Sequence, residues 1–209
     1  KGAKEVEPDG LVGRYLRARG VPQDSFPPCL RFLPNSKHMS GAIFPAMLAA
    51  VQAPDGAAAT LHRTFLAPDG LGKADVDRTR GTMAGIKIAR GSAVRLFKPR
   101  GDVLGVAEGI ETAFAAARLF NVPVWACLNS ALLKTWQPPE SIQRVMIFGD
   151  ADSLYGGQEA AYTLARRLSS PQSADGPTWH TEVHLPPRLG ADWLDVLNER
   201  GSQSTESMA

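Results

Sequence analysis

The sequence predicts an α/β fold, in which a mainly parallel sheet flanked by helices follows a smaller α+β part. From residue 102 onward, short apolar runs such as VLGVAEG alternate with helical segments such as ETAFAAARLF. Strands that alternate with helices are typical of βαβ units and of a parallel sheet. We therefore expect an N-terminal α+β part over residues 1–100, an α/β domain over residues 101–200 and a disordered tail over residues 201–209.

The N-terminal part carries signals for one helix and for strands that turn back on themselves. LVGRYLRARGV has apolar residues at helical spacing and a stop at Gly20. The tetrapeptide APDG occurs at residues 53–56 and 67–70, and its Pro and Gly favour turns, which predicts an antiparallel hairpin or meander. Residues 71–92 are polar and glycine-rich, so we expect a long exposed loop there, followed by a strand in AVRLFKP.

The distribution of charge suits a protein that handles a polyanion. Residues 61–100 hold nine Lys or Arg and three Asp, a net charge of +6, whereas residues 101–165 have a net charge of −4. A basic segment beside an acidic one fits a polyanion held near a metal centre, although two solvated surfaces would give the same pattern. No apolar run approaches eighteen residues, which excludes a membrane span and favours a cytoplasmic protein.

Three carboxylates follow two of the expected strands. Glu108 ends VLGVAEG, and Asp150 and Asp152 follow RVMIF. Ligands of open parallel sheets gather beyond the carboxyl ends of strands, and close carboxylates require a cation. Hard oxygen ligands select Mg²⁺, Mn²⁺ or Ca²⁺. The alternative is structural: the aspartates would cap the next helix, and Glu108 would favour the dipole of the helix that follows it.

The order of these motifs resembles the Toprim domain, a Rossmann-like fold shared by bacterial primases, topoisomerases and related nucleases. The resemblance covers residues 102–200 and rests on EGIET, on FGDADSLYGG and on ADWLDVLNE. Within this family, the sequence most resembles the primase-like proteins of phages, plasmids and integrated mobile elements. It implies a catalytic and metal-binding role, with Mg²⁺ or Mn²⁺, for Glu108, Asp150 and Asp152.

The resemblance also assigns roles to glycines and to further acids. Gly109 would permit a tight turn behind Glu108, and Gly156 or Gly157 would let the chain approach the metal. Replicative primases usually carry an acid four residues after the glutamate, where this chain has Thr112. That departure leaves the number of metals open. The accessory acids that the pattern suggests are Glu111, Asp192 and Asp195, and the alternative for the two aspartates is that they only cap a short helix.

These features favour a metal-dependent nucleotidyltransferase, a DNA primase core that makes short primers on single-stranded DNA from nucleoside triphosphates. A Toprim-type nuclease and a non-catalytic module that binds single-stranded DNA or a replication protein stay open as alternatives. We expect a replicative helicase or further domains as partners, because the opening KGAKEVEPDG has no initiator Met and suggests a segment of a longer protein. The residues expected to contact phosphates or nucleotide are His62, Arg63, Lys73 and Arg95.

Overall fold

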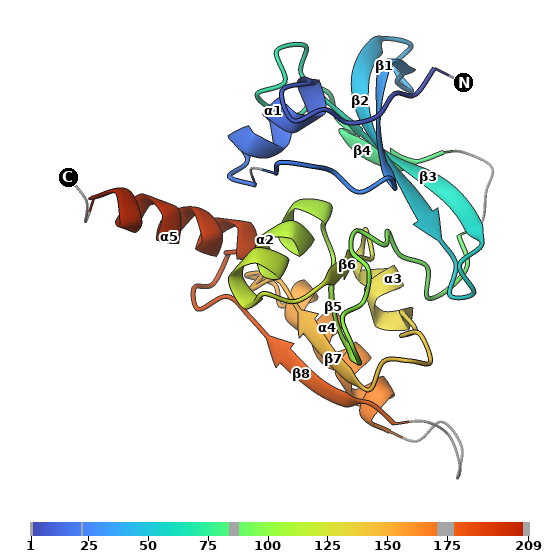
Figure 1. Cartoon of the computed structure of the whole chain (residues 1–209), viewed down its shortest axis with the longest axis vertical. Coiled ribbons are helices and arrows are strands. Elements are labelled where there is room, and N and C mark those ends of the chain that lie inside the picture. Colours follow the sequence, from blue (N-terminus) through green and yellow to red (C-terminus); the bar gives the residue numbers. More distant parts are fainter. Residues whose placement is uncertain (1, 22, 84–87, 171–177, 207–209) are drawn as a thin grey trace.

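Two four-stranded sheets make up the molecule, one before residue 100 and one after it (Figure 1). The computed structural model describes residues 2–21, 23–83, 88–170 and 178–206. The N-terminal sheet is antiparallel in the order β1-β2-β3-β4, and helix α1 shares a hydrophobic cluster with β1 and β2. The elements of this part are α1 (Leu11–Ala18), β1 (Leu30–Lys37), β2 (Ile43–Gln52), β3 (Ala58–Phe65) and β4 (Arg80–Thr82).

The expected meander is present, and each APDG forms a turn. In both copies the glycine has a positive φ, +87° at Gly56 and +74° at Gly70, a conformation that glycine adopts without strain. The aspartate of each copy accepts a hydrogen bond from the backbone N–H two residues on, at 2.9 Å. This is the Asx turn, which stabilises a tight reversal through the side chain of the turn itself.

Two sequence-based expectations for this part are wrong. Residues 71–92 are not one exposed loop, because they include strand β4, which pairs with β3, and because Ala74 and Ser92 are buried; residues 84–87 lie outside the described part. Residues 93–99 form no regular strand. Instead Ala93 bridges to β2 and Val94 bridges to β6 of the second sheet, so this segment joins the two sheets.

The C-terminal sheet is parallel and has the order β6-β5-β7-β8, as the α/β prediction required. The order reverses beside β5, because the chain moves from β5 to β6 and then crosses back to β7. The elements are β5 (Val103–Ala107), α2 (Ile110–Phe120), β6 (Val124–Ala126), α3 (Ser130–Thr135), β7 (Arg144–Phe148), α4 (Gly156–Ser169), β8 (His180–His184) and α5 (Trp193–Glu206). No helix in the described part of the chain has both the length and the hydropathy that a membrane span needs.

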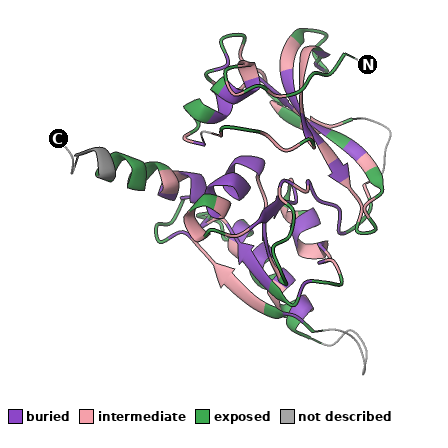
Figure 2. Ribbon diagram, in the orientation of Figure 1, coloured by how far each residue is buried: buried purple, intermediate pink, exposed green. Residues whose placement is uncertain are grey.

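Alternating side chains of the central strands pack against different helices. Leu104 and Val106 of β5 share a cluster with α3 and α4, whereas Ala107 shares one with α2 and α5. The second cluster continues into the N-terminal part through residues such as Tyr15 and Met47. Figure 2 shows the buried residues running through β5, β7 and α2 toward the upper sheet. The two sheets therefore share one hydrophobic core, which fixes their relative position.

Helix α5 extends farther than the sequence predicted. It runs to Glu206, so residues 201–206 are helical rather than part of a disordered tail, and residues 207–209 lie outside the described part. In Figure 1 the helix projects from the body of the molecule, and in Figure 2 its residues 198–203 are exposed.

Candidate active site

The carboxyl ends of β5 and β7 bring Glu108 and Asp150 to the same edge of the parallel sheet. The last residues of the strands, Ala107 and Phe148, are paired, so the chain leaves both strands side by side. Because the strand order reverses at this point, helices leave the two strands toward opposite faces and open a crevice for ligands. The geometry therefore places the predicted acids where open α/β sheets bind their substrates.

Asp152 does act as a helix cap. Its Oδ2 accepts a hydrogen bond from the backbone N–H of Gly157 at 2.7 Å, in the first turn of α4. The helix-capping alternative is thus correct for this residue, although the side chain as a whole is exposed. A capping role leaves a carboxylate free to use its other oxygen, and negative charge is stabilised at a helix N-terminus.

Asp150 is in a different situation. Its Oδ1 is buried and has no hydrogen-bond partner within the described residues. Burial, followed by the charges of Asp192, Glu108 and Asp152, raises its pKa to about 7, and Arg80 opposes this increase. A buried carboxylate oxygen without a partner costs free energy unless a proton or a cation compensates it. Asp150 is therefore the side chain at this edge that most requires a ligand.

Glu108 shares this electrostatic environment. Burial and the charge of Asp152 raise its pKa above the ordinary value, and Arg80 again acts in the opposite direction. Several acids thus repel one another at the ends of β5 and β7. The cation that acts on both Glu108 and Asp150 is an arginine of the N-terminal sheet.

Asp192, predicted as an accessory acid, contributes to this group, and Asp195 supports it. The backbone N–H of Asp192 donates to Oδ2 of Asp195 at 3.0 Å, and that of Asp195 donates to Oδ1 of Asp192 at 2.9 Å. Such a reciprocal capping box fixes the start of a helix, here α5. Because it also fixes the Asp192 carboxylate, the charge that raises the pKa of Asp150 is held in place.

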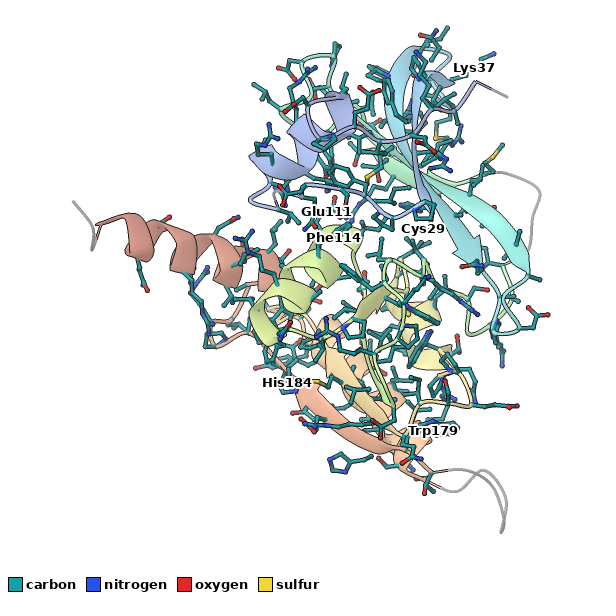
Figure 3. All side chains as sticks on the ribbon, viewed as in Figure 1. Cys29, Lys37, Glu111, Phe114, Trp179 and His184 are labelled. Atoms are coloured by element: carbon teal, nitrogen blue, oxygen red, sulfur yellow. The ribbon has the colours of Figure 1, made fainter. Side chains whose placement is uncertain are left out.

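Glu111 is not part of this acidic group. It is buried on α2, and its Oε1 accepts a hydrogen bond from the hydroxyl of Tyr15 at 2.5 Å. The Lys73 ammonium lies 3.8 Å from the same oxygen. Although burial raises the pKa of Glu111, Lys73 and Tyr15 together lower it below its ordinary value. Figure 3 shows Glu111 on α2 beneath α1, so this carboxylate ties the N-terminal part to the second sheet.

The basic residues that the sequence singled out divide into two groups. Lys73 and His62 lie beside the junction of the two sheets, since each interacts electrostatically with Glu111. Arg63 donates to the backbone oxygen of Lys37 and lies over the ring of Phe65, away from the acids.

Arg95 has a structural role in this structure. Its guanidinium donates to the carbonyls of Ala53 and Pro54, each at 2.8 Å, and lies over the ring of Trp125. We therefore do not assign a phosphate contact to it.

Sequence reasoning missed Arg80 as a site residue. It is exposed on β4, where it pairs with Thr64 of β3, and it lowers the pKa of both Glu108 and Asp150. The sequence placed it in an irregular loop among other basic residues, and no local pattern separated it from them. The pairing of β4 with β3 brings it within electrostatic reach of the acidic edge.

The three glycines that the resemblance singled out differ in how much space a side chain would have at each position. A side chain at Gly157 would lie 2.5 Å from the backbone oxygen of Asp150, so glycine lets α4 approach the end of β7. A side chain at Gly156 would meet Asp152 only at an ordinary distance of 3.5 Å. Gly109 has φ −87°, which any residue can adopt, so the tight turn expected there does not require glycine. An added side chain at Gly109 would instead crowd Oγ1 of Thr112, at 3.1 Å.

The donor set is suitable for a hard divalent cation. Among the described residues, no three His, Cys, Asp or Glu side chains are grouped closely enough to hold a metal ion by themselves. Mg²⁺ does not require such a cage, because it commonly binds one or two carboxylates and completes its shell with water and substrate phosphates. The buried Asp150 oxygen has no hydrogen-bond partner among the residues that the structure describes, and further acids act on it, which fits this mode of binding.

Two family models match the chain and divide it between the sheets. Residues 1–96 match a domain of unknown function, DUF7146, and residues 103–203 match the Toprim domain. No curated protein sequence matches the chain significantly.

Solved structures with similar folds include catalytic domains of primases. The primase fragment of the bacteriophage T7 primase-helicase protein has a TM-score of 0.55 at 13% identity, over 99% of this chain and 74% of that one. A DnaG primase catalytic domain bound to single-stranded DNA has a TM-score of 0.53 at 14% identity, over 96% and 74%. A DNA primase domain from Pseudomonas aeruginosa has a TM-score of 0.50 at 15% identity, over 95% and 58%.

At these identities the likeness establishes the fold alone, and the chain spans little more than half of the Pseudomonas aeruginosa structure. The boundary between the two sheets nevertheless agrees with the matched family model, because the parallel sheet lies within the residues that match the Toprim domain. Residues 103–203 form a Toprim domain, and the fold of the chain is that of primase catalytic domains.

Proposed function

We propose that this chain is the catalytic core of a mobile-element DNA primase, a metal-dependent nucleotidyltransferase that makes short primers on single-stranded DNA. It would act in the cytoplasm, beside a replicative helicase or as part of a longer polypeptide. The observation that carries the proposal is the acidic edge, where Asp150 has a buried oxygen without a hydrogen-bond partner in the described part of the chain and a pKa raised to about 7. The primase fold of the neighbouring structures supplies the reaction class.

Asp150, Asp152 and Glu108 would hold Mg²⁺ or Mn²⁺ at this edge. When bound, the metal stabilises negative charge on the transferring phosphate and on the attacking oxygen. Among the chain's own residues, Glu108 would accept the proton of the primer 3′-hydroxyl that attacks. It lies at the end of β5 and has a raised pKa, which suits this role. The capping bond from Gly157 would keep Asp152 in a fixed orientation during this step.

The N-terminal sheet would supply positive charge from the opposite side. Arg80 faces the acids from β4, and Lys73 lies at the junction between the sheets. Both are suited to contact the triphosphate, since phosphate is bound by such side chains through charge-assisted hydrogen bonds. The remaining basic residues of segment 61–100, except Arg95, would contribute to template binding, which depends on salt.

The proposal is tested with labelled nucleoside triphosphates, a single-stranded template and Mg²⁺ or Mn²⁺. We expect short template-dependent oligomers from the wild type and none from the double variant Asp150→Asn with Asp152→Asn. The fold should persist in that variant, because asparagine also caps helices. A matched control is Asp102→Asn. It changes an exposed acid that directly precedes β5, at the end of this strand opposite to Glu108.

The outcomes separate the alternatives. Synthesis that persists in the double variant would overturn the mechanism. Shortening of the template instead of synthesis would identify a nuclease. DNA binding that depends steeply on salt but not on divalent metal, without any product, would identify a binding module.

A further inference from the structure

A pocket of about 330 Å³ lies where the N-terminal sheet meets the loop that follows β6. Its wall is continuous with the acidic edge, since the backbone N–H of Leu128 donates to the carbonyl of Glu108 at 2.7 Å. A pocket of this size is at the lower end of those that bind small ligands. The described residues that line it are His62, Arg80, Gly81, Thr82, Ile88, Leu128 and Asn129.

His62 is the buried polar group of this pocket. The residue is only 7% exposed, and its Nδ1 is buried without a hydrogen-bond partner among the described residues. Burial, with smaller contributions from Arg80 and Lys73, lowers its pKa to about 4, so the imidazole is neutral near pH 7. A neutral imidazole offers one donor and one acceptor, which suits an uncharged polar partner such as a hydroxyl rather than a phosphate.

The other lining residues divide the pocket into a charged and an apolar side. Arg80 is the charged residue among those that line it, and it faces the acids. Ile88 and Leu128 are apolar. The Oδ1 of Asn129 accepts the backbone N–H of Leu132 at 2.9 Å, so that oxygen is engaged in capping α3.

The strand register sets the distance between the neutral and the charged group. His62 pairs with Thr82, and Arg80 lies two residues before Thr82 on the same face of β4. Residues in this diagonal arrangement are about 7–8 Å apart. In a nucleotide the sugar is joined directly to the phosphates and the base lies beyond it. A phosphate at Arg80 would therefore bring the sugar to His62, with the base toward the apolar side.

We propose that this pocket binds the sugar of the incoming nucleotide and that His62 hydrogen-bonds the 2′-hydroxyl, so that the protein selects ribonucleoside over deoxyribonucleoside triphosphates. The inference rests on the proposed function, because it assumes that triphosphate is bound at the acidic edge. It adds the class of sugar and the residue that reads it. His62 is a specificity residue in this account and takes no part in the chemistry.

The test is calorimetric titration of ATP and of dATP into the Mg²⁺-loaded protein. We expect the wild type to bind ATP about tenfold more tightly than dATP, the effect of one hydrogen bond of about 1.4 kcal/mol. His62→Ala should bind ATP as weakly as dATP and leave the affinity for dATP within about twofold. His62→Gln, which restores a donor and an acceptor, should recover part of the preference. Leu61→Ala, on the other face of β3, is the matched control.

Equal binding of ATP and dATP by the wild type would overturn the inference, as would a preference for ATP that survives in His62→Ala. The result can be distinguished from a failure of the proposed function. If primers form from both sugars equally, the inference fails and the function stands. If His62 selects ATP but no primer forms, the pocket is a nucleotide site and the primase proposal fails.

Discussion

Glu108 and Glu111 are three residues apart at the start of α2, and their surroundings are opposite. Glu111 is buried beside a hydroxyl and an ammonium, both from the N-terminal part, and its pKa is lowered. Glu108 is half-buried among other acids, and its pKa is raised. One carboxylate is stabilised as an anion by the folded protein, and the other is destabilised as an anion by it.

The difference separates an acid that the fold itself neutralises from one that we propose to be functional. The chain provides a partner for Glu111, so this residue can hold the two sheets together without any ligand. At the edge formed by Glu108, Asp150 and Asp192, the repulsion persists in the folded protein, because the neighbouring Arg80 only partly opposes it. Perturbed carboxyl groups that lack a protein partner and lie at a strand end are typical of sites that bind a cation or exchange a proton.

The largest expected effect is on catalysis. Glu108→Gln should reduce primer synthesis by at least about 100-fold, because it removes an ionisable group at the reacting centre. Glu111→Gln should keep most of the activity of each folded molecule. The measurement is the rate of oligomer formation, normalised to the folded fraction determined by circular dichroism. Equal losses in the two variants would remove the distinction between these acids.

The next largest effect is on stability, where a substitution of Glu111 should cost more than one of Glu108. Glu111→Ala should lower the free energy of unfolding by about 2–3 kcal/mol, because it leaves the Tyr15 hydroxyl and Lys73 without their partner; partial exposure of Lys73 keeps the value at the lower end of the usual range. Tyr15→Phe should cost about 1 kcal/mol. Urea unfolding measures both values. Glu108→Ala is the comparison, and a loss of stability as large as that of Glu111→Ala would contradict the account.

The smallest effect is a pH dependence whose sign differs between the two regions. Because the pKa of Asp150 rises from 3.8 to about 7 on folding, the native state holds a proton that the unfolded state has lost between these values. Without divalent metal, its contribution to stability therefore falls as the pH rises from about 4 to about 7. The lowered pKa of Glu111 acts in the other sense: its contribution is present above about pH 4.5 and is lost as the pH falls further.

Thermal unfolding across this pH range, in a metal chelator, distinguishes these contributions. Asp150→Asn should remove the loss of stability on the neutral side and leave the acid side unchanged. Glu111→Gln should weaken the acid dependence and leave the neutral side unchanged. If neither substitution alters the profile, the two carboxylates do not carry the assigned charges.

Much of the acidic edge could be predicted from the sequence, because its parts follow from local patterns. Apolar runs marked where β5 and β7 end, and parallel strands bring those ends to one edge. These two patterns together predict that Glu108 and Asp150 lie close to each other. The ADWLDVLNE motif suggested Asp192 and Asp195 as accessory acids or as helix caps. Both residues cap α5, and Asp192 also raises the pKa of Asp150.

The partners of Glu111 and the position of Arg80 could not be predicted in this way. Tyr15 is 96 residues from Glu111 in the chain, and no local periodicity connects them. Strand β4 has only three residues, in a polar and glycine-rich segment, so it resembles a loop. Both features depend on how the two sheets pack against each other, which is decided by the shared core rather than by local patterns.

The measurement that tests the central claim most directly is the binding of Mn²⁺, followed by calorimetry near pH 7, to the wild type, to Asp150→Asn and to Glu111→Gln. The account predicts that the wild type binds the ion, that Asp150→Asn raises the dissociation constant at least about tenfold, and that Glu111→Gln leaves it within about twofold. Unchanged binding by Asp150→Asn, or no binding by the wild type, would contradict the claim that the uncompensated acids at the ends of β5 and β7 form a cation site.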